Sequence, residues 1–260
     1  MRTIYSIKEL KAYRQANSVE KTMGFVPTMG ALHEGHLSLC QRSMDENDFS
    51  IASIFINPTQ FDSSVDLESY PSCIEKDLEV LERMGISAVF LPNDQDMYHD
   101  NFAYQLRETS FSEKLCGANR PGHFTGVLTV VMKLLNLVWP NRAYFGKKDY
   151  QQLELIRGMC AAFFLDVEIV GVETVRDSEG LALSSRNALL NEEGLKMARK
   201  LNKMLAVGDA DDVVSSKLSA EGLLVDYVET HKGRRYGAVR APGKAGSIRL
   251  IDNVTLEASV

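Results

Sequence analysis

Two histidines stand three residues apart in the segment His33-Glu34-Gly35-His36, directly after an apolar run and a turn that contains glycine. If a helix begins here, the two imidazoles lie near each other and beside the free N–H groups of the helix N-terminus. Imidazole N–H groups can donate hydrogen bonds to phosphate oxygens as negative charge moves during a transfer reaction. The segment therefore predicts a polyphosphate site.

A metal site is the main rival explanation for this histidine pair. The pattern His-x-x-His supplies too few ligands for zinc, and it is not the His-Glu-x-x-His of zinc proteases. The two residues could also be surface histidines near a helix cap. The motif alone leaves the phosphate and surface interpretations open.

Two further polar segments could bind phosphate groups. In residues 146–152 (GKKDYQQ), a lysine at a strand-to-helix turn can reach a phosphate as a point charge. Asp149 could cap the following helix or bind a ribose hydroxyl, and Gln152 could face the same cleft. Residues 183–187 (LSSRN) offer two hydroxyls and a guanidinium, which suits a triphosphate, although the segment could be a polar linker.

Amide and guanidinium groups occur in two other segments. Residues 57–61 (NPTQF) could hydrogen-bond a small polar substrate, but Asn-Pro is also a common strand terminator. In residues 120–124 (RPGHF), Arg120 could bind a carboxylate or a partner subunit. His123 could be no more than a neighbour of a helix N-cap.

The elements that position these segments alternate between strands and helices. Strands are predicted over residues 23–26, 50–56, 88–91, 143–145 and 167–170. Helices are predicted over residues 36–47, 74–84, 124–139 and 149–164, with Ser72 and Glu75 as a capping box for the second. This alternation is typical of an α/β protein with an open, Rossmann-like parallel sheet. Ligands of such sheets bind beyond the carboxyl ends of the strands, where residues 27–36, 57–61 and 146–149 fall.

The alternation stops near residue 175. Residues 192–205 predict an amphipathic helix, residues 223–228 and 248–251 predict strands, and residues 234–246, rich in Gly, Arg and Lys, predict a loop. We therefore expect two domains. They are a Rossmann-like domain over residues 1–175 and a smaller α+β domain over residues 176–260.

Composition excludes several classes of protein. The net charge of −6 over 260 residues disfavours a nucleic-acid partner. The longest apolar stretch, residues 127–139, contains Lys133 and Asn136 and is too short to span a membrane. The four cysteines form no Cys-x-x-Cys pair, and the first residues lack a signal-peptide core. We expect a soluble cytoplasmic protein with reduced thiols.

Familiar catalytic patterns are missing. The sequence contains no P-loop, no G-x-G-x-x-G fingerprint and no G-x-S-x-G elbow. Neither a P-loop nor a dinucleotide-binding fingerprint therefore applies, and the nucleophilic serine of an α/β-hydrolase is disfavoured.

Taken together and in this order, the segments resemble the pantothenate synthetase family. The resemblance is carried by residues 25–36 (FVPTMGALHEGH), 53–61 (SIFINPTQF), 120–124 (RPGHF), 146–152 (GKKDYQQ), 180–187 (GLALSSRN) and 250–253 (LIDN). Each motif is modest alone, but their joint order is highly specific and spans nearly the whole chain.

The resemblance implies a nucleotidyltransferase-superfamily ligase. Such an enzyme joins (R)-pantoate to β-alanine with ATP through a pantoyl-adenylate, releasing AMP and pyrophosphate, and makes pantothenate, a coenzyme A precursor. It also implies a requirement for Mg²⁺ and a homodimer formed through the N-terminal domain. It does not identify the metal-contacting residues, although Asp77 is one carboxylate that could lie near the metal.

The resemblance also implies roles for individual residues. The catalytic residues are His33, His36, Lys148 and Arg186. The ATP-binding residues are Met29, Gly30, Ala31, Leu32, His33, Glu34, Gly35, His36, Gly146, Lys147, Lys148, Asp149, Val175, Leu183, Ser184, Ser185 and Arg186. Gln60 and Gln152 bind pantoate, and Gln60 also binds β-alanine.

Some positions depart from the family pattern. Lys147 stands where Glu or Gln is frequent, Ser72 where Arg is common, and Cys116 where Glu is common. Residues 231–246 form a shorter and more basic segment. Two alternatives remain: another nucleotidyltransferase that keeps the nucleotide in its product, and a non-catalytic nucleotide-binding module.

Overall fold

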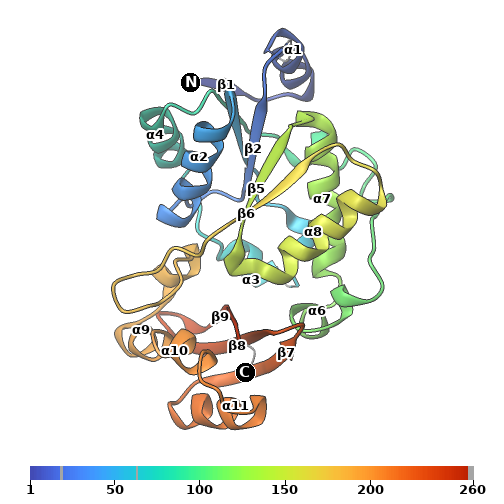
Figure 1. Cartoon of the computed structure of the whole chain (residues 1–260). Coiled ribbons are helices and arrows are strands. Elements are labelled where there is room, and N and C mark those ends of the chain that lie inside the picture. The colour runs from blue at the N-terminus through green and yellow to red at the C-terminus, as the bar shows by residue number, and fades with distance from the viewer. Residues whose placement is uncertain (18–19, 63, 257–260) are drawn as a thin grey trace.

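The larger part of the molecule is built on a parallel sheet. The computed structural model describes residues 1–17, 20–62 and 64–256. Within them, six strands pair in the order β1-β4-β3-β2-β5-β6, and every pair is parallel (Figure 1). The strands are β1 (Arg2–Ile4), β2 (Met23–Thr28), β3 (Phe49–Ile54), β4 (Ala88–Phe90), β5 (Arg142–Gly146) and β6 (Glu168–Val172). The Rossmann-like parallel sheet predicted from the sequence is thus confirmed.

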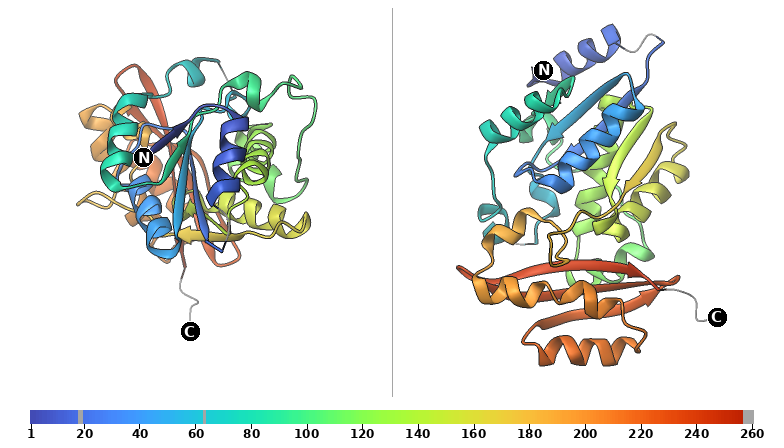
Figure 2. Two further views of the ribbon diagram at one scale, coloured as in Figure 1. Left: turned by 90° about the horizontal axis from the view of Figure 1, so that it is seen from above. Right: turned by 60° about the vertical axis from the view of Figure 1, so that its left-hand side comes forward.

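Helices cover both faces of this sheet, as the view from above shows (Figure 2). The longer ones are α1 (Ile7–Asn17), α2 (Glu34–Glu46), α4 (Ile74–Met84), α7 (His123–Val138) and α8 (Tyr150–Ala162). Neighbouring strand residues face opposite cores: Phe25 packs with α7 and α8, whereas Val26 packs with α2. Because both faces are buried, the strands are apolar runs without polar alternation, which made them visible in the sequence.

The sheet order reverses between β2 and β5. These strands pair only through Gly24 with Arg142 and Phe25 with Ala143, although β2 continues to Thr28 and β5 to Gly146. Their carboxyl ends therefore separate. Such a reversal point is where open α/β sheets bind ligands.

A smaller unit follows β6. Three antiparallel strands, β7 (Leu224–His231), β8 (Arg234–Gly243) and β9 (Gly246–Thr255), pair in sequence order. Helices α9 (Glu192–Ala198), α10 (Leu201–Leu205) and α11 (Asp211–Ala220) cover one face around a separate core (Figure 2). On the other face, Tyr236 and Ala238 join the large core of the parallel sheet. The small sheet therefore faces the carboxyl ends of the parallel strands.

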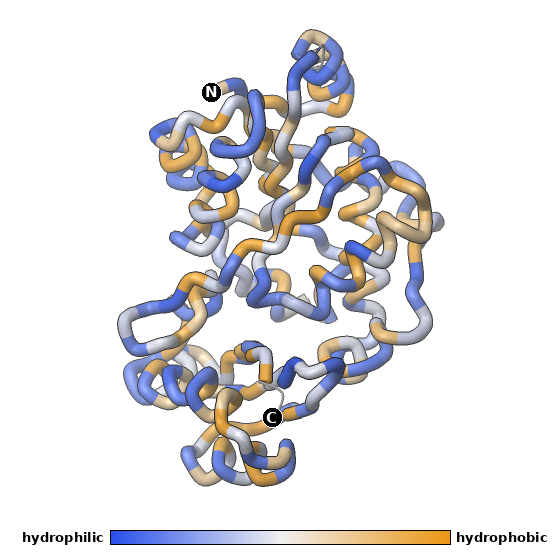
Figure 3. Tube along the Cα trace, in the orientation of Figure 1, coloured by the Kyte–Doolittle hydropathy of each residue, from blue (hydrophilic) through white to orange (hydrophobic). Residues whose placement is uncertain are grey.

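Short helical segments complete the chain. They are α3 (Ser64–Glu68), α5 (Asp94–Met97), α6 (Cys116–Asn119) and the 3₁₀ turns η1 (Pro58–Gln60), η2 (Phe111–Glu113), η3 (Lys147–Asp149) and η4 (Ser185–Leu189). In Figure 3, β6 is largely hydrophobic, whereas the chain just after β5 is hydrophilic. Within the described ranges, no helix has the length and apolarity needed to cross a membrane.

Three sequence predictions of local structure are wrong. Residues 234–246 contain strand β8 instead of a loop, because Arg235 is buried and binds Asp211 and the carbonyl oxygens before α11. The helix predicted over residues 192–205 is broken between α9 and α10. Ser72 does not cap α4, since the N-cap is Cys73, which makes no side-chain cap hydrogen bond.

Candidate active site

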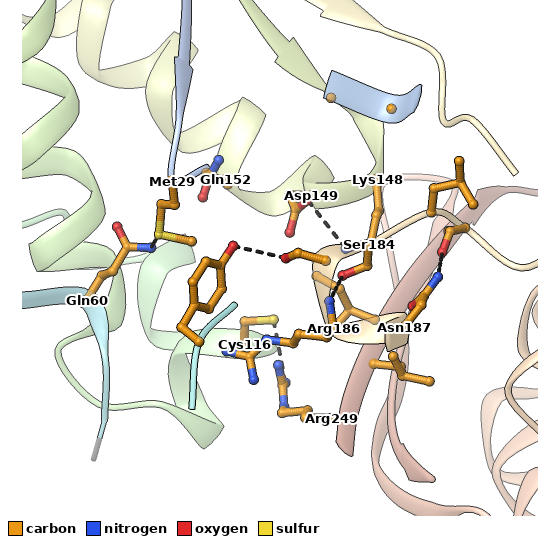
Figure 4. A pocket seen from close by; sticks show the side chains of 18 of the residues that line it. Met29, Gln60, Cys116, Lys148, Asp149, Gln152, Ser184, Arg186, Asn187 and Arg249 are labelled. Atoms are coloured by element: carbon orange, nitrogen blue, oxygen red, sulfur yellow. Dashed lines mark hydrogen bonds and ion pairs between the residues drawn. The ribbon is translucent and has the colours of Figure 1, made fainter. Parts of the chain in front are cut away.

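A cavity of about 890 Å³ lies between the carboxyl ends of the parallel strands and the small antiparallel sheet. Figure 4 shows part of its wall. Most of the predicted site residues line it: Met29, His33, Gly35, His36, Gln60, Gly146, Lys148, Asp149, Gln152, Val175, Leu183, Ser184, Ser185 and Arg186. Segments more than 100 residues apart in sequence thus meet in one chamber.

Five of the predicted ATP-binding residues are not brought to the cavity wall. They are Gly30, Ala31, Leu32, Glu34 and Lys147. The amide of Gly30 donates to the hydroxyl of Thr28, and the Lys147 ammonium pairs with the exposed Glu173. These groups already have partners within the protein, so their role in ATP binding gains no support from the geometry.

The turn after β2 is held by Asp77. One oxygen of its buried carboxylate accepts the amide hydrogen of Ala31 and the other that of Leu32, both at 2.8 Å. Gly30 and Ala31 both have positive φ, at 79° and 49°, which is unfavourable for alanine. The two hydrogen bonds offset this strain and fix the turn that leads to His33.

Asp77 is therefore a scaffold residue. Both carboxylate oxygens point to the main chain, so the suggestion that it lies beside a metal ion gains no support. Within the described residues, no group of three His, Cys, Asp or Glu side chains is arranged to hold a metal ion.

The two histidines stand together at the start of α2, with ring centroids 4.1 Å apart. His33 is the N-cap, and its Nδ1 accepts the amide hydrogen of Gly35 at 3.1 Å. A neutral His33 therefore carries its proton on Nε2. Burial, aided by the charge of Lys148, lowers the pKa of His33 to about 4. Burial and the neighbouring His33 lower the pKa of His36 to about 3. Both rings are neutral hydrogen-bond donors at pH 7.

The helix N-terminus itself offers fewer donors than the sequence suggested. The Gly35 amide is capped by His33, and the amides of His36 and Leu37 both bind the His33 carbonyl oxygen. The expectation of free N–H groups at this helix N-terminus is therefore wrong for Gly35 and His36. The imidazole side chains are the groups available to phosphate oxygens.

Lys148 and Asp149 lie in the turn between β5 and α8. The Lys148 ammonium is 3.5 Å from the Asp149 carboxylate, and its side chain is 20% exposed. Asp149 occupies the N-cap position of α8 but makes no cap hydrogen bond with its side chain. The capping alternative for Asp149 is thus wrong. Its carboxylate remains available to a ligand hydroxyl.

A second part of the cavity is rich in amides. Gln60 follows β3 in η1, and its Nε2 lies 3.0 Å from the Met29 sulfur. Gln152 lines the cavity from the first turn of α8. In the view of Figure 4, Gln60 and Met29 lie on the left, and Lys148 and Ser184 lie on the right. This arrangement offers a neutral polar end and a cationic end.

The loop with Ser184 to Asn187 crosses to the N-terminal part. Arg186 forms a bidentate ion pair with Asp66, at 2.7 and 2.9 Å, and Ser185 shares a hydrogen bond with Tyr70 at 3.1 Å. Burial raises the pKa of Asp66, but the hydrogen bond and charge of Arg186 outweigh it and lower the pKa overall. The loop is thus docked over the cavity, and not a free linker.

The RPGHF segment supports Gln60. Arg120 pairs with Asp62, so its carboxylate partner lies within this chain. His123 begins α7 and donates from Nδ1 to the Gln60 carbonyl oxygen at 2.8 Å. Burial, then the charge of Arg120, lowers the pKa of His123 to about 4. A neutral His123 therefore holds the main chain of Gln60.

Several residues of the site were not singled out as such from the sequence. Asp66 and Tyr70 dock the serine-rich loop, and Asn253 of β9 lines the cavity and binds the Lys148 carbonyl oxygen. Cys116 contacts Tyr227 and Arg249 across the two units. Of these residues, only Asn253 could have been identified from the sequence, because it lies in the segment 250–253 (LIDN) that carries the family resemblance.

Comparison with known proteins gives one consistent result. A family model described as pantoate-beta-alanine ligase matches residues 2–255. A pantothenate synthetase of Bdellovibrio bacteriovorus is 49% identical over 251 residues, which cover 96% of this chain and 98% of that protein. One from Legionella pneumophila (strain Lens) is 45% identical and covers 98% of this chain and 100% of that protein.

Solved structures agree. A pantoate-beta-alanine ligase from Francisella tularensis, complexed with "Beta-gamma ATP" and β-alanine, superposes with a TM-score of 0.90 at 36% identity, covering 98% of this chain and 97% of that one. A pantothenate synthetase from Thermus thermophilus gives a TM-score of 0.88 at 38% identity, covering 99% and 100%. With the model match over nearly its whole length, the chain belongs to the pantoate–β-alanine ligase family.

Proposed function

We propose that the cavity catalyses the ATP-dependent condensation of (R)-pantoate with β-alanine to pantothenate, with release of AMP and pyrophosphate. One observation carries the proposal. A cationic end with Lys148 and an amide end with Gln60 and Gln152 share one cavity at the reversal point of the sheet. A reaction that brings a nucleotide triphosphate to a small hydroxy acid needs both ends.

In the first step, the pantoate carboxylate oxygen attacks the α-phosphorus of ATP, and pyrophosphate leaves. The enzyme has to bring two anions together, so most of the catalysis is positioning and charge stabilisation. Lys148 supplies positive charge, and Arg186 adds to it when it exchanges the Asp66 carboxylate for a phosphate. Neutral His33 and His36 donate hydrogen bonds to phosphate oxygens. No covalent bond to the protein is required.

In the second step, the β-alanine amine attacks the acyl carbonyl of pantoyl-adenylate. The amide bond forms, the amine loses a proton, and AMP leaves. Gln60 binds both acids in this scheme, and Gln152 binds pantoate. The Francisella tularensis relative, whose structure holds β-alanine and a nucleotide, supports a cavity with room for both.

Mg²⁺ belongs to this proposal as the partner of the nucleotide. When bound, it would neutralise part of the phosphate charge. The exposed carboxylate of Asp149, on the cavity wall, could supply one oxygen ligand or bind the ribose. The other metal ligands would be phosphate oxygens and water.

Two features of organisation are also proposed. Residues 1–175 would form the domain that binds nucleotide and pantoate, and residues 176–260 a lid that excludes water from the adenylate. The chain would form a homodimer through the N-terminal domain. Light scattering on the pure protein tests this, since a dimer has twice the chain mass of 29.0 kDa.

The function is tested by product analysis. The full chain is incubated with ATP, Mg²⁺, pantoate and β-alanine, and each component is omitted in turn. We expect AMP and pantothenate in equal amounts only when all four are present. A product that retains the nucleotide would indicate another nucleotidyltransferase, and ATP binding without turnover would indicate a binding module; either would overturn the proposal.

A further inference from the structure

Tyr98 lies just after α5 and does not line the cavity, yet its hydroxyl contacts the residue that orients Gln60. The hydroxyl donates to Asn57 Oδ1 at 2.6 Å and lies 3.2 Å from the Thr59 hydroxyl. Tyr98 is 8% exposed. It is therefore a buried group one step removed from the proposed substrate site.

The amide of Asn57 has a fixed orientation. Its Oδ1 accepts hydrogen bonds from Tyr98 and from the Thr59 hydroxyl, the latter at 2.9 Å. Its Nδ2 donates to the Gly126 carbonyl oxygen and to Gln60 Oε1, both at 3.2 Å. The Gly126 carbonyl oxygen can only accept a hydrogen bond, so a flipped Asn57 amide would set Oδ1 against it and lose this bond.

The close approach of α7 makes this network possible. A Cβ atom on Gly126 would lie 2.4 Å from the Thr59 carbonyl oxygen, so only glycine lets α7 pack this tightly on η1. The Gly126 carbonyl oxygen thereby reaches Asn57, which is 1% exposed. The network is thus held by main-chain packing and not by Asn57 alone.

The orientation of Asn57 decides which atom Gln60 offers to the cavity. Because Gln60 Oε1 accepts from Asn57, its Nε2 is the atom directed at the Met29 sulfur. A thioether is a weak acceptor, so an incoming substrate oxygen can replace it. The opposite orientation of the Gln60 amide would present an oxygen, which repels a carboxylate.

We propose that Tyr98 is a positioning residue that acts through Asn57 and keeps the Gln60 N–H group directed at pantoate. The inference rests on the proposed function, in which Gln60 binds that substrate. Burial raises the pKa of Tyr98 to about 12, so its hydroxyl stays protonated and donates at physiological pH. The Lys133 ammonium lies 4.5 Å from the ring centroid and Phe102 packs against the ring edge, so the ring stays in place without its hydroxyl.

The test is Tyr98→Phe in the full chain, with KM measured for each substrate. Losing one buried hydrogen bond costs about 1–1.5 kcal/mol, which corresponds to a rise of about tenfold in the pantoate KM. The ATP KM should stay within about twofold of the parent value, because no phosphate-binding group moves.

A second variant, Thr59→Val, removes the other hydroxyl that donates to Asn57 Oδ1. It should have the same selective effect on the pantoate KM, and it replaces Tyr98→Phe if that variant does not fold. Tyr13→Phe, which removes a hydroxyl at the same core from α1, is the matched control and should change neither KM.

A double-mutant cycle with Gln60→Ala separates positioning from a general structural role. In the Gln60→Ala background, Tyr98→Phe should cause no further rise in the pantoate KM. Additive effects, or an unchanged pantoate KM in Tyr98→Phe while Gln60→Ala raises it, would overturn the role of Tyr98 and leave the proposed function intact. If Gln60→Ala itself leaves the pantoate KM unchanged, the assignment of Gln60 and the role of Tyr98 both fall.

Discussion

The side-chain amide of Asn253, on the last strand of the small sheet, donates a hydrogen bond to the main-chain carbonyl oxygen of Lys148 at 2.8 Å. The same nitrogen lies 3.0 Å from the carbonyl oxygen of Lys147. Asn253 is 7% exposed and lines the cavity. The small sheet is thus fastened directly to the turn that holds the cationic end of the site.

We predict that Asn253→Ala uncouples the two half-reactions. Two carbonyl oxygens lose their partner, so the small sheet holds less firmly and water reaches the adenylate. We expect kcat to fall about tenfold and AMP to exceed pantothenate, measured by chromatography of both products. Asn136→Ala, on the exposed side of α7, is the control. Equal amounts of AMP and pantothenate at an unchanged kcat would refute the role of Asn253.

The two neighbouring lysines should behave differently. Lys148 lines the cavity, whereas Lys147 pairs with Glu173 at the surface. Removing a charge aimed at developing negative charge costs about 10²–10³-fold in kcat, so we expect this loss for Lys148→Ala. Lys147→Ala is the matched control and should keep near-normal turnover. Pyrophosphate release with pantoate and ATP alone measures the first step, and near-normal release by Lys148→Ala would contradict the assignment.

Five of the six strands of the sheet could be predicted because they are short apolar runs, and three of these runs end near a proline or an asparagine. The remaining strand, β1, has only three residues and was not predicted. β2 ends one residue past Pro27 and β3 ends before Asn57, and the polar segments that follow them meet at one edge. β8 could not be predicted, since Arg235 is buried only because Asp211 and three carbonyl oxygens lie around it. Its partners come from tertiary structure, which the local sequence does not reveal.

The contacts across the cavity wall also depend on tertiary structure that the local sequence does not reveal. The alternation of strands and helices predicted that the histidines and the lysine turn lie at the cavity, because both segments follow the ends of strands. The pairing of Arg186 with Asp66 spans 120 positions, and that of Tyr70 with Ser185 spans 115. No periodicity connects such positions, so single-sequence reasoning offers no means of pairing them.

Asp77→Asn should loosen the turn after β2. An amide has one oxygen, so it cannot accept the hydrogen bonds of both Ala31 and Leu32 in their present geometry. We expect the free energy of unfolding to fall by about 1–3 kcal/mol and the ATP KM to rise, because the strained turn leads to His33. Urea denaturation and steady-state kinetics measure the two effects. The exposed Glu75 of the same helix, replaced by Gln, is the control, and an Asn variant as stable as the parent would show that the carboxylate is not needed.

The buried histidines make stability depend on pH in a defined direction. The pKa of His36 falls from 6.5 to about 3 and that of His33 to about 4, in both cases mainly through burial. Above pH 6.5 both rings are neutral in the folded and the unfolded chain. Below pH 6.5, the unfolded chain binds protons that the folded chain does not, so the parent loses stability as the pH falls from 6.5 towards these lowered values.

His36→Asn removes one of these two groups. It should reduce the loss of unfolding free energy by up to about 1.4 kcal/mol per pH unit, measured by urea denaturation between pH 7 and pH 4.5. Asn136→Ala, at an exposed position that does not titrate, should keep the pH dependence of the parent. A His36→Asn variant with the parent's slope would mean that His36 binds its proton equally well in the folded and the unfolded chain, which would contradict the lowering of its pKa by burial.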